Sequence, residues 1–324
     1  MTEARPLLRV DALRKEFTVS SGLFAKPRTI RAVSDVSFSI IAGETLGLVG
    51  ESGCGKTTVG RLILNLIEPT AGLVEFDGTD LRALDASQMR AMRRDLQIVF
   101  QDPLGALNPR MTVGELIMEP LVIHGVGDNV DRQQRLGKLL SLVGLASYHA
   151  GRFPHEFSGG QRQRICIARA LALNPRFIVC DEAASALDVS IQAQTLNLLQ
   201  DLKAELGLTY LFISHDLGVI RHISDRVIVM YLGRVMESGT KHQIFRSTAH
   251  PYTRALLGAV PSRKHGKMRF NALKGELPNP ANPPEGCRFN TRCPMVRDIC
   301  RTAPPPLMKL EDGHEAACHF AGQI

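Results

Sequence analysis

A glycine-rich segment, residues 50–58, constrains the fold more than any other part of this 324-residue chain. Its sequence, GESGCGKTT, contains the pattern G-x-x-x-x-G-K-T, which forms a phosphate-binding loop between a strand and a helix. The apolar run before it, residues 45–49, suits a buried parallel strand. Apolar residues recur at helical spacing after the loop, so we expect it to open a helix, whose N-terminus attracts anions. The segment predicts a nucleotide site in an α/β fold.

The residue types of this loop match the chemical groups of a nucleotide. Its glycines allow backbone N–H groups to point at phosphate oxygens. Lys56 is expected to reach the β- and γ-phosphates, and the Thr57 hydroxyl to bind Mg²⁺. Cys54, like Cys166 and Cys180, is interpreted as a small packing residue. Because Cys54 stands at a helix start, where the pKa of a thiol can be lowered, a reactive thiol is a second hypothesis for it. The predicted ATP-binding residues of the loop are Gly50, Glu51, Ser52, Gly53, Cys54, Gly55, Lys56, Thr57 and Thr58.

Composition and charge narrow the class of protein that carries this loop. The chain is 44% hydrophobic and 22% charged, as in an ordinary globular protein, and its length suggests one large domain plus an extension. No apolar run approaches the ~20 residues of a transmembrane helix, and the N-terminus lacks an apolar signal core, so we expect a cytosolic protein or one held at a membrane by partners. The net charge of +7 comes without a long Lys/Arg block, which favours a solvated basic surface, and no nucleic-acid partner is expected.

Alternating and apolar segments predict further strands. Residues 7–19 are expected to form an edge strand with a polar face, residues 20–29 a loop, and residues 32–40 a half-exposed strand. Further strands are expected at residues 74–78, 96–100, 177–182 and 210–214. Phe17 is an aromatic residue upstream of a phosphate loop, which fits stacking on adenine as well as it fits an ordinary core position.

Polar residues stand at the ends of three of these strands, and ligands bind at the carboxyl ends of strands in α/β sheets. Asp181 and Glu182 follow a strand that is apolar throughout. Because neighbouring residues on a strand point to opposite sides, one carboxylate can serve Mg²⁺ and the other the attacking water. Gln101 can bind Mg²⁺ or orient water, and His215 can contact a γ-phosphate. Taken singly, Gln101 and His215 are better explained as structural residues.

The stretch from about residue 105 to 173 predicts a helical subdomain inserted between strands, because its apolar residues recur at helical spacing with few strand signals. Near its end Ser158 is a natural N-cap, and the two glycines after it expose backbone N–H groups, so this helix start is a second candidate anion site. A simple Ser-Gly cap is the default explanation of that feature taken alone. A further helix is expected from about residue 189 to 205, closed by Gly207.

Together these segments resemble the nucleotide-binding subunits of ABC transporters over residues 7 to about 260. The motifs of that family are matched by the phosphate loop (Walker A), Phe17 (adenine-stacking aromatic), Gln101 (Q-loop), Ser158-Gly159-Gly160-Gln161 (signature), Asp181-Glu182 (Walker B and catalytic glutamate), Ser185-Ala186-Leu187-Asp188 (D-loop) and His215 (H-loop). The match is specific because the six motifs other than Phe17 occur in the family's order along the chain. Ala183-Ala184 replaces the more usual Pro-Thr after the glutamate.

The resemblance implies a P-loop NTPase of the ABC type, with an antiparallel β subdomain and the inserted helical subdomain, that hydrolyses ATP. Glu182 would polarise the attacking water, His215 would steady the γ-phosphate, and Gln101 with Thr57 and Asp181 would hold Mg²⁺. The signature residues would act on the ATP of a partner subunit.

The resemblance also implies an assembly. Its members would be a second ABC ATP-binding subunit in a heterodimer, two integral membrane permease subunits and an extracytoplasmic substrate-binding protein. This chain would be the peripheral ATPase of a translocase, on the cytoplasmic face of the bacterial inner membrane.

Residues 98–110 and 153–158, with the tail segments 286–294 and 317–319, are similar to the ATPases of dipeptide and oligopeptide importers, and most of all to the second of their two ATP-binding subunits. Nickel and glutathione importers belong to the same group, so these cargoes are alternatives to peptides. A soluble ABC ATPase acting on DNA or ribosomes is disfavoured, because no heptad run lasts three repeats and the chain has one Walker A.

The last part of the chain, residues 261–324, is predicted to be a small irregular extension of an ABC domain that covers residues 1–260. It holds 9 of the 18 prolines, so long regular elements are not expected. Its four cysteines are the number for a Cys₄ site, but their spacings of five, six and seventeen residues do not match the short CxxC pairs of most zinc ribbons. The family resemblance implies a [4Fe–4S] cluster, with Zn²⁺ and free thiols as alternatives. The predicted ligands are Cys287, Cys293, Cys300 and Cys318.

Overall fold

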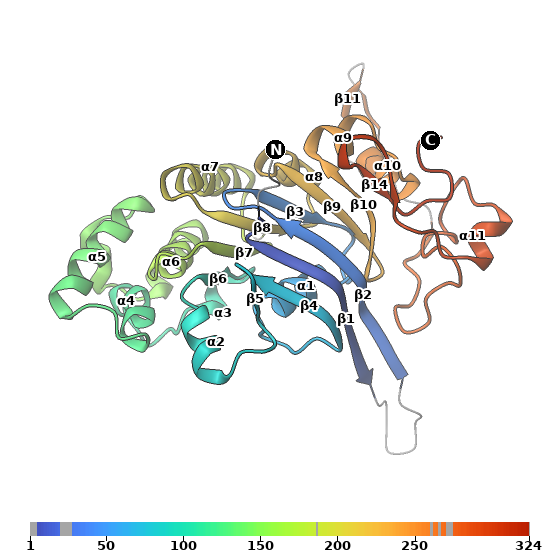
Figure 1. The fold of residues 1–324 in the computed structure, drawn as a ribbon. Helices are drawn as coiled ribbons and strands as arrows, with labels where there is room; N and C mark the ends of the chain where they lie inside the picture. The colour runs from blue at the N-terminus through green and yellow to red at the C-terminus, as the bar shows by residue number, and fades with distance from the viewer. Residues whose placement is uncertain are drawn as a thin grey trace. The chain divides into compact units, whose positions relative to one another are not determined.

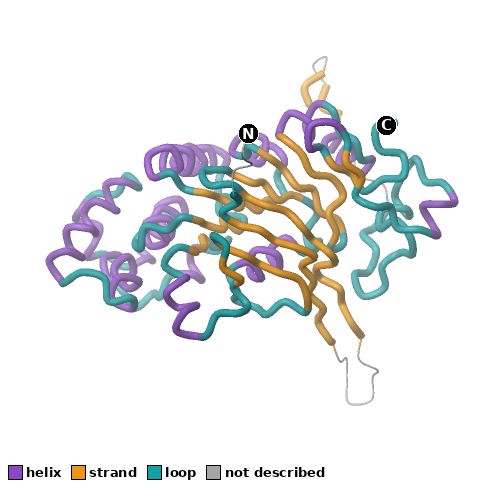
Figure 2. Tube along the Cα trace, in the orientation of Figure 1, coloured by secondary structure: helices purple, strands orange, loops and turns teal. Residues whose placement is uncertain are grey.

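The computed structural model describes residues 5–19, 28–185, 187–259, 262–264, 267–269 and 275–323. The chain divides into two compact units, and Figures 1 and 2 show the helices and strands that they contain. The first unit comprises Met1–Pro6, Ile40–Thr45 and Leu81–Ile213. The second comprises Leu7–Ser39, Leu46–Asp80 and Ser214–Ile324. Among the described residues, no helix is both long enough and apolar enough to cross a bilayer.

Three parallel strands form the centre of the first unit, in the order β8-β7-β6. β6 (Leu96–Val99) pairs with β7 (Phe177–Asp181), and β7 pairs with β8 (Thr209–Ser214). Every residue of β7 and β8 is buried, as expected for parallel strands that are covered on both faces. The three strands predicted in this part of the sequence are therefore confirmed, to within one residue at each end.

The rest of the first unit is mainly helical. Its helices are α2 (Ala86–Met92), α3 (Pro103–Ala106), α4 (Val113–Ile123), α5 (Asn129–Leu142), α6 (Gly159–Leu171) and α7 (Val189–Leu206), with 3₁₀ turns η1 (Ser147–Gly151) and η2 (Pro154–Glu156). α4, α5 and α6 contact one another and form the green group in Figure 1. α7 ends at Gly207, whose φ of +65° is the left-handed conformation of a glycine C-cap, as predicted. The bounds of the helical subdomain stay a prediction.

An antiparallel sheet forms one part of the second unit. Its order is β2 (Arg28–Ile40), β1 (Leu8–Val19), β4 (Ala71–Phe76) and β5 (Thr79–Asp80). The prediction of β1 as an edge strand is wrong, because β1 lies between β2 and β4. The loop predicted at residues 20–29 ends earlier, since β2 already begins at Arg28, and its residues 20–27 lie outside the described part of the chain.

A second sheet of this unit contains the strand that leads into the phosphate loop. β3 (Thr45–Val49) pairs in parallel with β9 (Arg226–Tyr231), and β9 pairs with the antiparallel β10 (Arg234–Thr240). Two short strands of the tail, β14 (Glu315–Ala316) and β13 (Met308–Lys309), continue the sheet from β10. The remaining elements are α1 (Lys56–Ile63), α8 (Leu217–Ile223), α9 (Lys241–Arg246), α10 (Pro251–Ala259), β11 (Ser262–Lys264), β12 (Lys267–Arg269), α11 (Asp298–Thr302) and the 3₁₀ turn η3 (Glu311–Gly313).

Candidate nucleotide site

The phosphate loop follows β3 and opens α1, as the sequence predicted. Gly55 has a φ of +105°, and a Cβ at this position would come within 2.3 Å of the Ala32 carbonyl oxygen, so only glycine fits. The Lys56 ammonium lies inside the curled loop, where it donates to the Gly50 carbonyl at 2.8 Å and to the Glu51 carbonyl at 3.1 Å. In this position the ammonium could replace its two carbonyl partners with phosphate oxygens. Thr57 and Thr58 follow, half-buried in the first turn of α1.

Cys54 does not have the chemistry that its place in the loop predicted. Its side chain is 1% exposed. Burial raises the pKa of the thiol, and the neighbouring Lys56 ammonium lowers it by less. The prediction of a lowered thiol pKa is therefore wrong, because desolvation outweighs the helix start. Cys54 is a small packing residue, as are Cys166 and Cys180, which are also buried.

Phe17 lies near the end of β1, in the same unit as the phosphate loop. Its side chain is 39% exposed, and the Lys15 ammonium lies 5.1 Å from the centre of its ring. An ordinary core position, one of the two explanations of this residue, is therefore excluded. A partly exposed aromatic ring fits the stacking role that the family resemblance implies.

The first unit brings together the polar residues at the ends of β6 and β7. Asp181 is the last residue of β7 and is buried, and Glu182 follows in a left-handed conformation with a φ of +49°. The Glu182 backbone N–H donates to the Ile213 carbonyl at 2.9 Å, which ties this turn to β8. Gln101 lies after β6, and its side-chain amide donates to the Glu182 carboxylate at 2.9 Å. Two side chains that are 81 residues apart in sequence are thus one hydrogen-bonded pair.

The predicted signature forms the start of α6. The Ser158 hydroxyl accepts from the Gln161 backbone N–H at 3.3 Å, and the Gln161 side chain accepts from the Ser158 backbone N–H at 3.1 Å. This is a complete capping box, and Ser158 and Gly159 remain exposed. Gly160 is buried, and a Cβ there would come within 2.4 Å of the Ile191 side chain on α7. The sequence of this helix start is therefore set by both capping and close packing.

The two remaining predicted site residues lie at the surface. Asp188 is the exposed N-cap residue of α7, and its side chain makes no capping hydrogen bond. His215 is exposed in the turn between β8 and α8, next to Asp216, whose side chain caps α8. Ala186, in the predicted D-loop, lies outside the described residues.

Sequence reasoning missed the residues that hold Glu51 of the phosphate loop. The Tyr252 hydroxyl accepts from the Glu51 backbone N–H at 3.0 Å, and the Arg292 guanidinium makes two hydrogen bonds to its carboxylate. These partners are 201 and 241 residues away along the chain. No local pattern marked them, although Arg292 stands directly before one of the predicted cysteine ligands.

The four tail cysteines line one small cavity in the second unit, together with aromatic and apolar side chains such as Phe289, Met295 and Phe320. Burial raises the pKa of the Cys287 thiol to about 11. In the described part of the chain, no three His, Cys, Asp or Glu side chains are arranged to hold a metal ion. The shared cavity brings the predicted ligands together without the geometry of a single-ion site.

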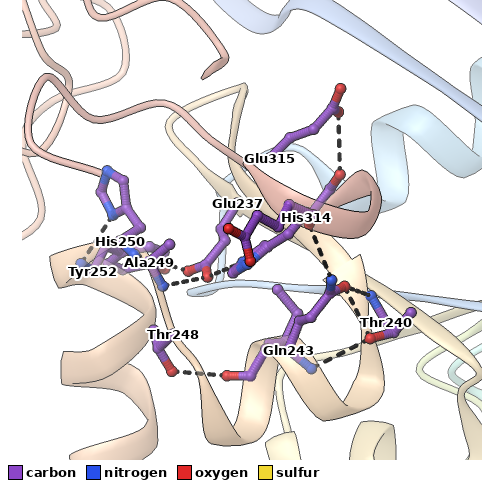
Figure 3. Close-up of polar contacts among 12 residues, drawn as sticks. Glu237, Thr240, Gln243, Thr248, Ala249, His250, Tyr252, His314 and Glu315 are labelled. Atoms are coloured by element: carbon purple, nitrogen blue, oxygen red, sulfur yellow. Dashed lines mark hydrogen bonds and ion pairs between the residues drawn. The ribbon is translucent and has the colours of Figure 1, made fainter. Parts of the chain in front are cut away.

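The tail is attached to β10 by a buried carboxylate, Glu237 (Figure 3). This carboxylate accepts from the backbone N–H groups of Ala249 at 2.7 Å and His250 at 3.2 Å. It also lies 2.8 Å from Nε2 of His314, which precedes β14. His314 is therefore engaged with Glu237 rather than placed among the cysteines.

A family model described as "ABC transporter" matches residues 33–185, and one described as "Oligopeptide/dipeptide transporter, C-terminal region" matches residues 236–300. The putative peptide import ATP-binding protein BOV_A0347 of Brucella ovis is 54% identical and covers 98% of both chains. The oligopeptide transport ATP-binding protein AppF of Bacillus subtilis is 52% identical and covers 97% of both. The chain belongs to the ABC transporter ATP-binding proteins.

Among solved structures, the dimeric post-hydrolysis state of the ATP-binding cassette MJ0796, bound to ADP and Pi, is 31% identical to this ABC protein. The match has a TM-score of 0.64 and covers 72% of this chain and 98% of that one. It confirms the expected α/β fold of an ABC ATPase. The chain is therefore an ATPase.

Proposed function

We propose that this ABC ATPase powers the import of dipeptides and oligopeptides through a membrane transporter. The proposal rests on how much of the chain aligns with its relatives. Relatives named for peptide import or oligopeptide transport align over 97–98% of the chain, and residues 236–300 match the C-terminal region of oligopeptide and dipeptide transporters. A match confined to the ABC motifs would support ATP hydrolysis alone.

In the proposed mechanism the phosphate loop binds ATP from Gly50 to Thr58. Lys56 exchanges its two carbonyl bonds for the β- and γ-phosphates, and Phe17 stacks on adenine. Thr57, Gln101 and Asp181 offer a hydroxyl, an amide oxygen and a carboxylate, which are the hard oxygen donors that suit Mg²⁺. When bound, Mg²⁺ would supply charge neutralisation on the phosphates.

Glu182 acts on the attacking water in this mechanism. Its carboxylate takes a proton from the water as the water oxygen bonds to the γ-phosphorus, and the bond from the γ-phosphorus to the bridging β-phosphate oxygen breaks. The proton then passes to the inorganic phosphate that is formed. Lys56 and the loop amides stabilise the charge that develops on the departing ADP. The 2.9 Å bond between Gln101 and Glu182 supports a shared role for these two side chains. His215 steadies the γ-phosphate.

We further propose that the signature residues Ser158, Gly159, Gly160 and Gln161, with Asp188, act on the nucleotide of a second ABC subunit. The exposed position of Ser158 and Gly159 at a capped helix start supports this role, because such a helix start can bind an anion carried by another chain. The assembly would be a heterodimer of ABC subunits on two permease subunits, served by an extracytoplasmic substrate-binding protein. The chain would lie peripherally on the cytoplasmic face of the bacterial inner membrane.

The four tail cysteines are proposed to bind a [4Fe–4S] cluster. In such a cluster each iron takes one thiolate, so the four sulfurs stand farther apart than they do around one ion. The four cysteines line one cavity, which supports a shared site for the cluster, with Zn²⁺ as the alternative. When bound, the cluster would fasten a segment whose described helices and strands have at most five residues.

Gentle extraction of the tagged chain from its own membranes tests the transport function. We expect two integral membrane subunits and a second ABC ATPase to be recovered with it, and the associated binding protein to bind peptides. A binding protein that takes nickel or glutathione instead would change the cargo. Recovery of the chain with ribosomes or DNA in the soluble fraction would overturn the transport function, although the ATPase activity would remain supported.

Anaerobic purification tests the cluster. We expect visible absorption with iron and sulfide in equal amounts, lost in Cys293→Ser and retained in Cys166→Ser, because Cys166 is buried in the other unit. A colourless protein with stoichiometric zinc would overturn this assignment.

A further inference from the structure

Glu51, the second residue of the phosphate loop, is held by a side chain from the cysteine-rich tail. The Arg292 guanidinium donates from Nη1 to Oε2 at 2.7 Å and from Nη2 to Oε1 at 3.0 Å. Both residues belong to the second compact unit. Two parallel hydrogen bonds between a planar guanidinium and a carboxylate fix the orientation of the carboxylate as well as its position.

This ion pair is shielded from solvent. The Arg292 side chain is 5% exposed and the Glu51 side chain is 24% exposed. Nη1 of Arg292 also donates to the Tyr231 hydroxyl at 3.2 Å. Removal of one partner from such a pair leaves a poorly solvated charge, which is more costly than the loss of a surface ion pair.

An aromatic cluster packs beside Arg292 and the phosphate loop. Tyr231, Tyr252 and Phe289 are fully buried, and their ring centres lie 4.6 to 5.5 Å apart. Phe289 lies between the first two tail cysteines, and its carbonyl accepts from the Arg292 backbone N–H at 3.0 Å. The Tyr252 hydroxyl in turn accepts from the Glu51 backbone N–H at 3.0 Å. The tail and the loop are therefore joined by one continuous packed network.

The charge of Glu51 makes this network relevant to ATP. A carboxylate in a loop that receives a polyphosphate repels its ligand unless a cation compensates it. The Lys56 ammonium points into the loop and is expected to bind the phosphates. The Glu51 carboxylate is instead paired with the Arg292 guanidinium, which comes from the tail.

We propose that Arg292 is a positioning residue for ATP, which neutralises and orients Glu51 so that the phosphate loop accepts a polyanion. The cysteine-rich tail thereby sets the affinity of the loop for nucleotide. This inference rests on the proposed ATP site, and it assigns the tail a role in nucleotide binding that is separate from any metal it holds.

The test is a double-mutant cycle in the full-length protein, with Mg²⁺·ADP titrated by calorimetry and ATPase kinetics measured in parallel. Arg292→Ala is expected to raise the Kd for ADP and the KM for ATP about tenfold, because it leaves the Glu51 carboxylate uncompensated, with kcat changed less than about twofold. Glu51→Gln is expected to bind ADP at least as tightly as the wild type. The double variant is expected to return to within about threefold of the wild type, since no charge is left in the pair.

The matched control is Arg301→Ala, which removes an exposed arginine of the same tail and is expected to leave the Kd unchanged. Rescue by Glu51→Gln separates neutralisation from a merely structural role, because the loss of an anchor is not repaired by changing its partner. If Arg292→Ala does not fold, Arg292→Gln takes its place in the cycle with the same expected results.

Two results would overturn the inference: wild-type affinity in a folded Arg292 variant, or a double variant that binds as weakly as Arg292→Ala. Lys56→Ala separates this failure from that of the proposed ATP site. If Lys56→Ala loses ADP binding and the Arg292 variant does not, the proposed ATP site is supported and the role of Arg292 is contradicted. If Lys56→Ala binds ADP as the wild type does, the site itself is misassigned.

Discussion

Burial decides the chemistry of Cys54 despite its place at a helix start. Because its pKa is raised, the fraction of thiolate at pH 8 is smaller than in an exposed cysteine. We predict that iodoacetamide modifies Cys54 much more slowly than it modifies glutathione at this pH, with a rate that keeps rising above the ordinary thiol pKa. Mass spectrometry of the digested protein measures the rate. Modification as fast as that of glutathione would show that the thiol is accessible and activated.

The site residues that could be predicted from the sequence are those whose role depends on local pattern. The phosphate loop needs its glycines, lysine and threonine at fixed spacing, and Asp181-Glu182 follows a visibly apolar strand. The pairing of Gln101 with Glu182 required the order of the strands, and Arg292 required knowledge of which side chain lies against Glu51. The hypothesis of a reactive Cys54 thiol was wrong because the thiol is buried, and no local sequence feature indicates that burial.

The N-terminus of α4 is stabilised by a capping box of Thr112 and Glu115. The Thr112 hydroxyl accepts from the Glu115 backbone N–H at 3.3 Å, and the Glu115 carboxylate accepts from the Thr112 backbone N–H at 2.7 Å. We predict that Thr112→Ala destabilises the first turn of α4 by about 1 kcal/mol. Hydrogen exchange should then be faster at the first amides of α4, measured against the first amides of α5 as an internal reference.

The same cap should depend on pH. The hydrogen bonds from the backbone and side chain of Thr112 lower the pKa of Glu115. A carboxyl whose pKa is lower in the folded state stabilises the fold above its unfolded pKa, and this contribution is lost as the pH falls through the folded pKa. Protection of the first turn should therefore decrease below the ordinary glutamate pKa in the wild type, and less so in Glu115→Gln. Identical pH profiles in the two proteins would contradict the role of the carboxylate.

Elements with strong internal patterns could be predicted, and those defined by their neighbours could not. Apolar runs predict β7 and β8, and the closing Gly207 marks the end of α7. The position of β1 within its sheet was mispredicted, because an edge strand differs from an inner strand only by which other strands pair with it. The polar alternation that suggested an edge is compatible with a strand between β2 and β4.

At the scale of the whole molecule, nucleotide binding and hydrolysis should respond differently to substitution. A ligand that binds only the folded state stabilises it by about 2.7 kcal/mol at a hundred times its Kd. We predict that Mg²⁺·ATP raises the unfolding temperature of the wild type and of Glu182→Gln, because Glu182 acts on water rather than on the phosphates. Lys56→Ala should lose most of this stabilisation, since its ammonium is the cation inside the loop.

Phosphate release completes this prediction. Turnover in Glu182→Gln should fall by roughly 10²–10⁴-fold, the range for loss of a general base, while its ATP-dependent stabilisation remains. Lys56→Ala should lose both turnover and stabilisation, and Arg301→Ala should lose neither. A Glu182→Gln protein with near-normal turnover would remove Glu182 from catalysis. A Glu182→Gln protein that also loses the ATP-dependent stabilisation would show that Glu182 takes part in ATP binding as well as in hydrolysis. This result would contradict the assignment of ATP binding to the phosphate loop and of hydrolysis to the end of β7.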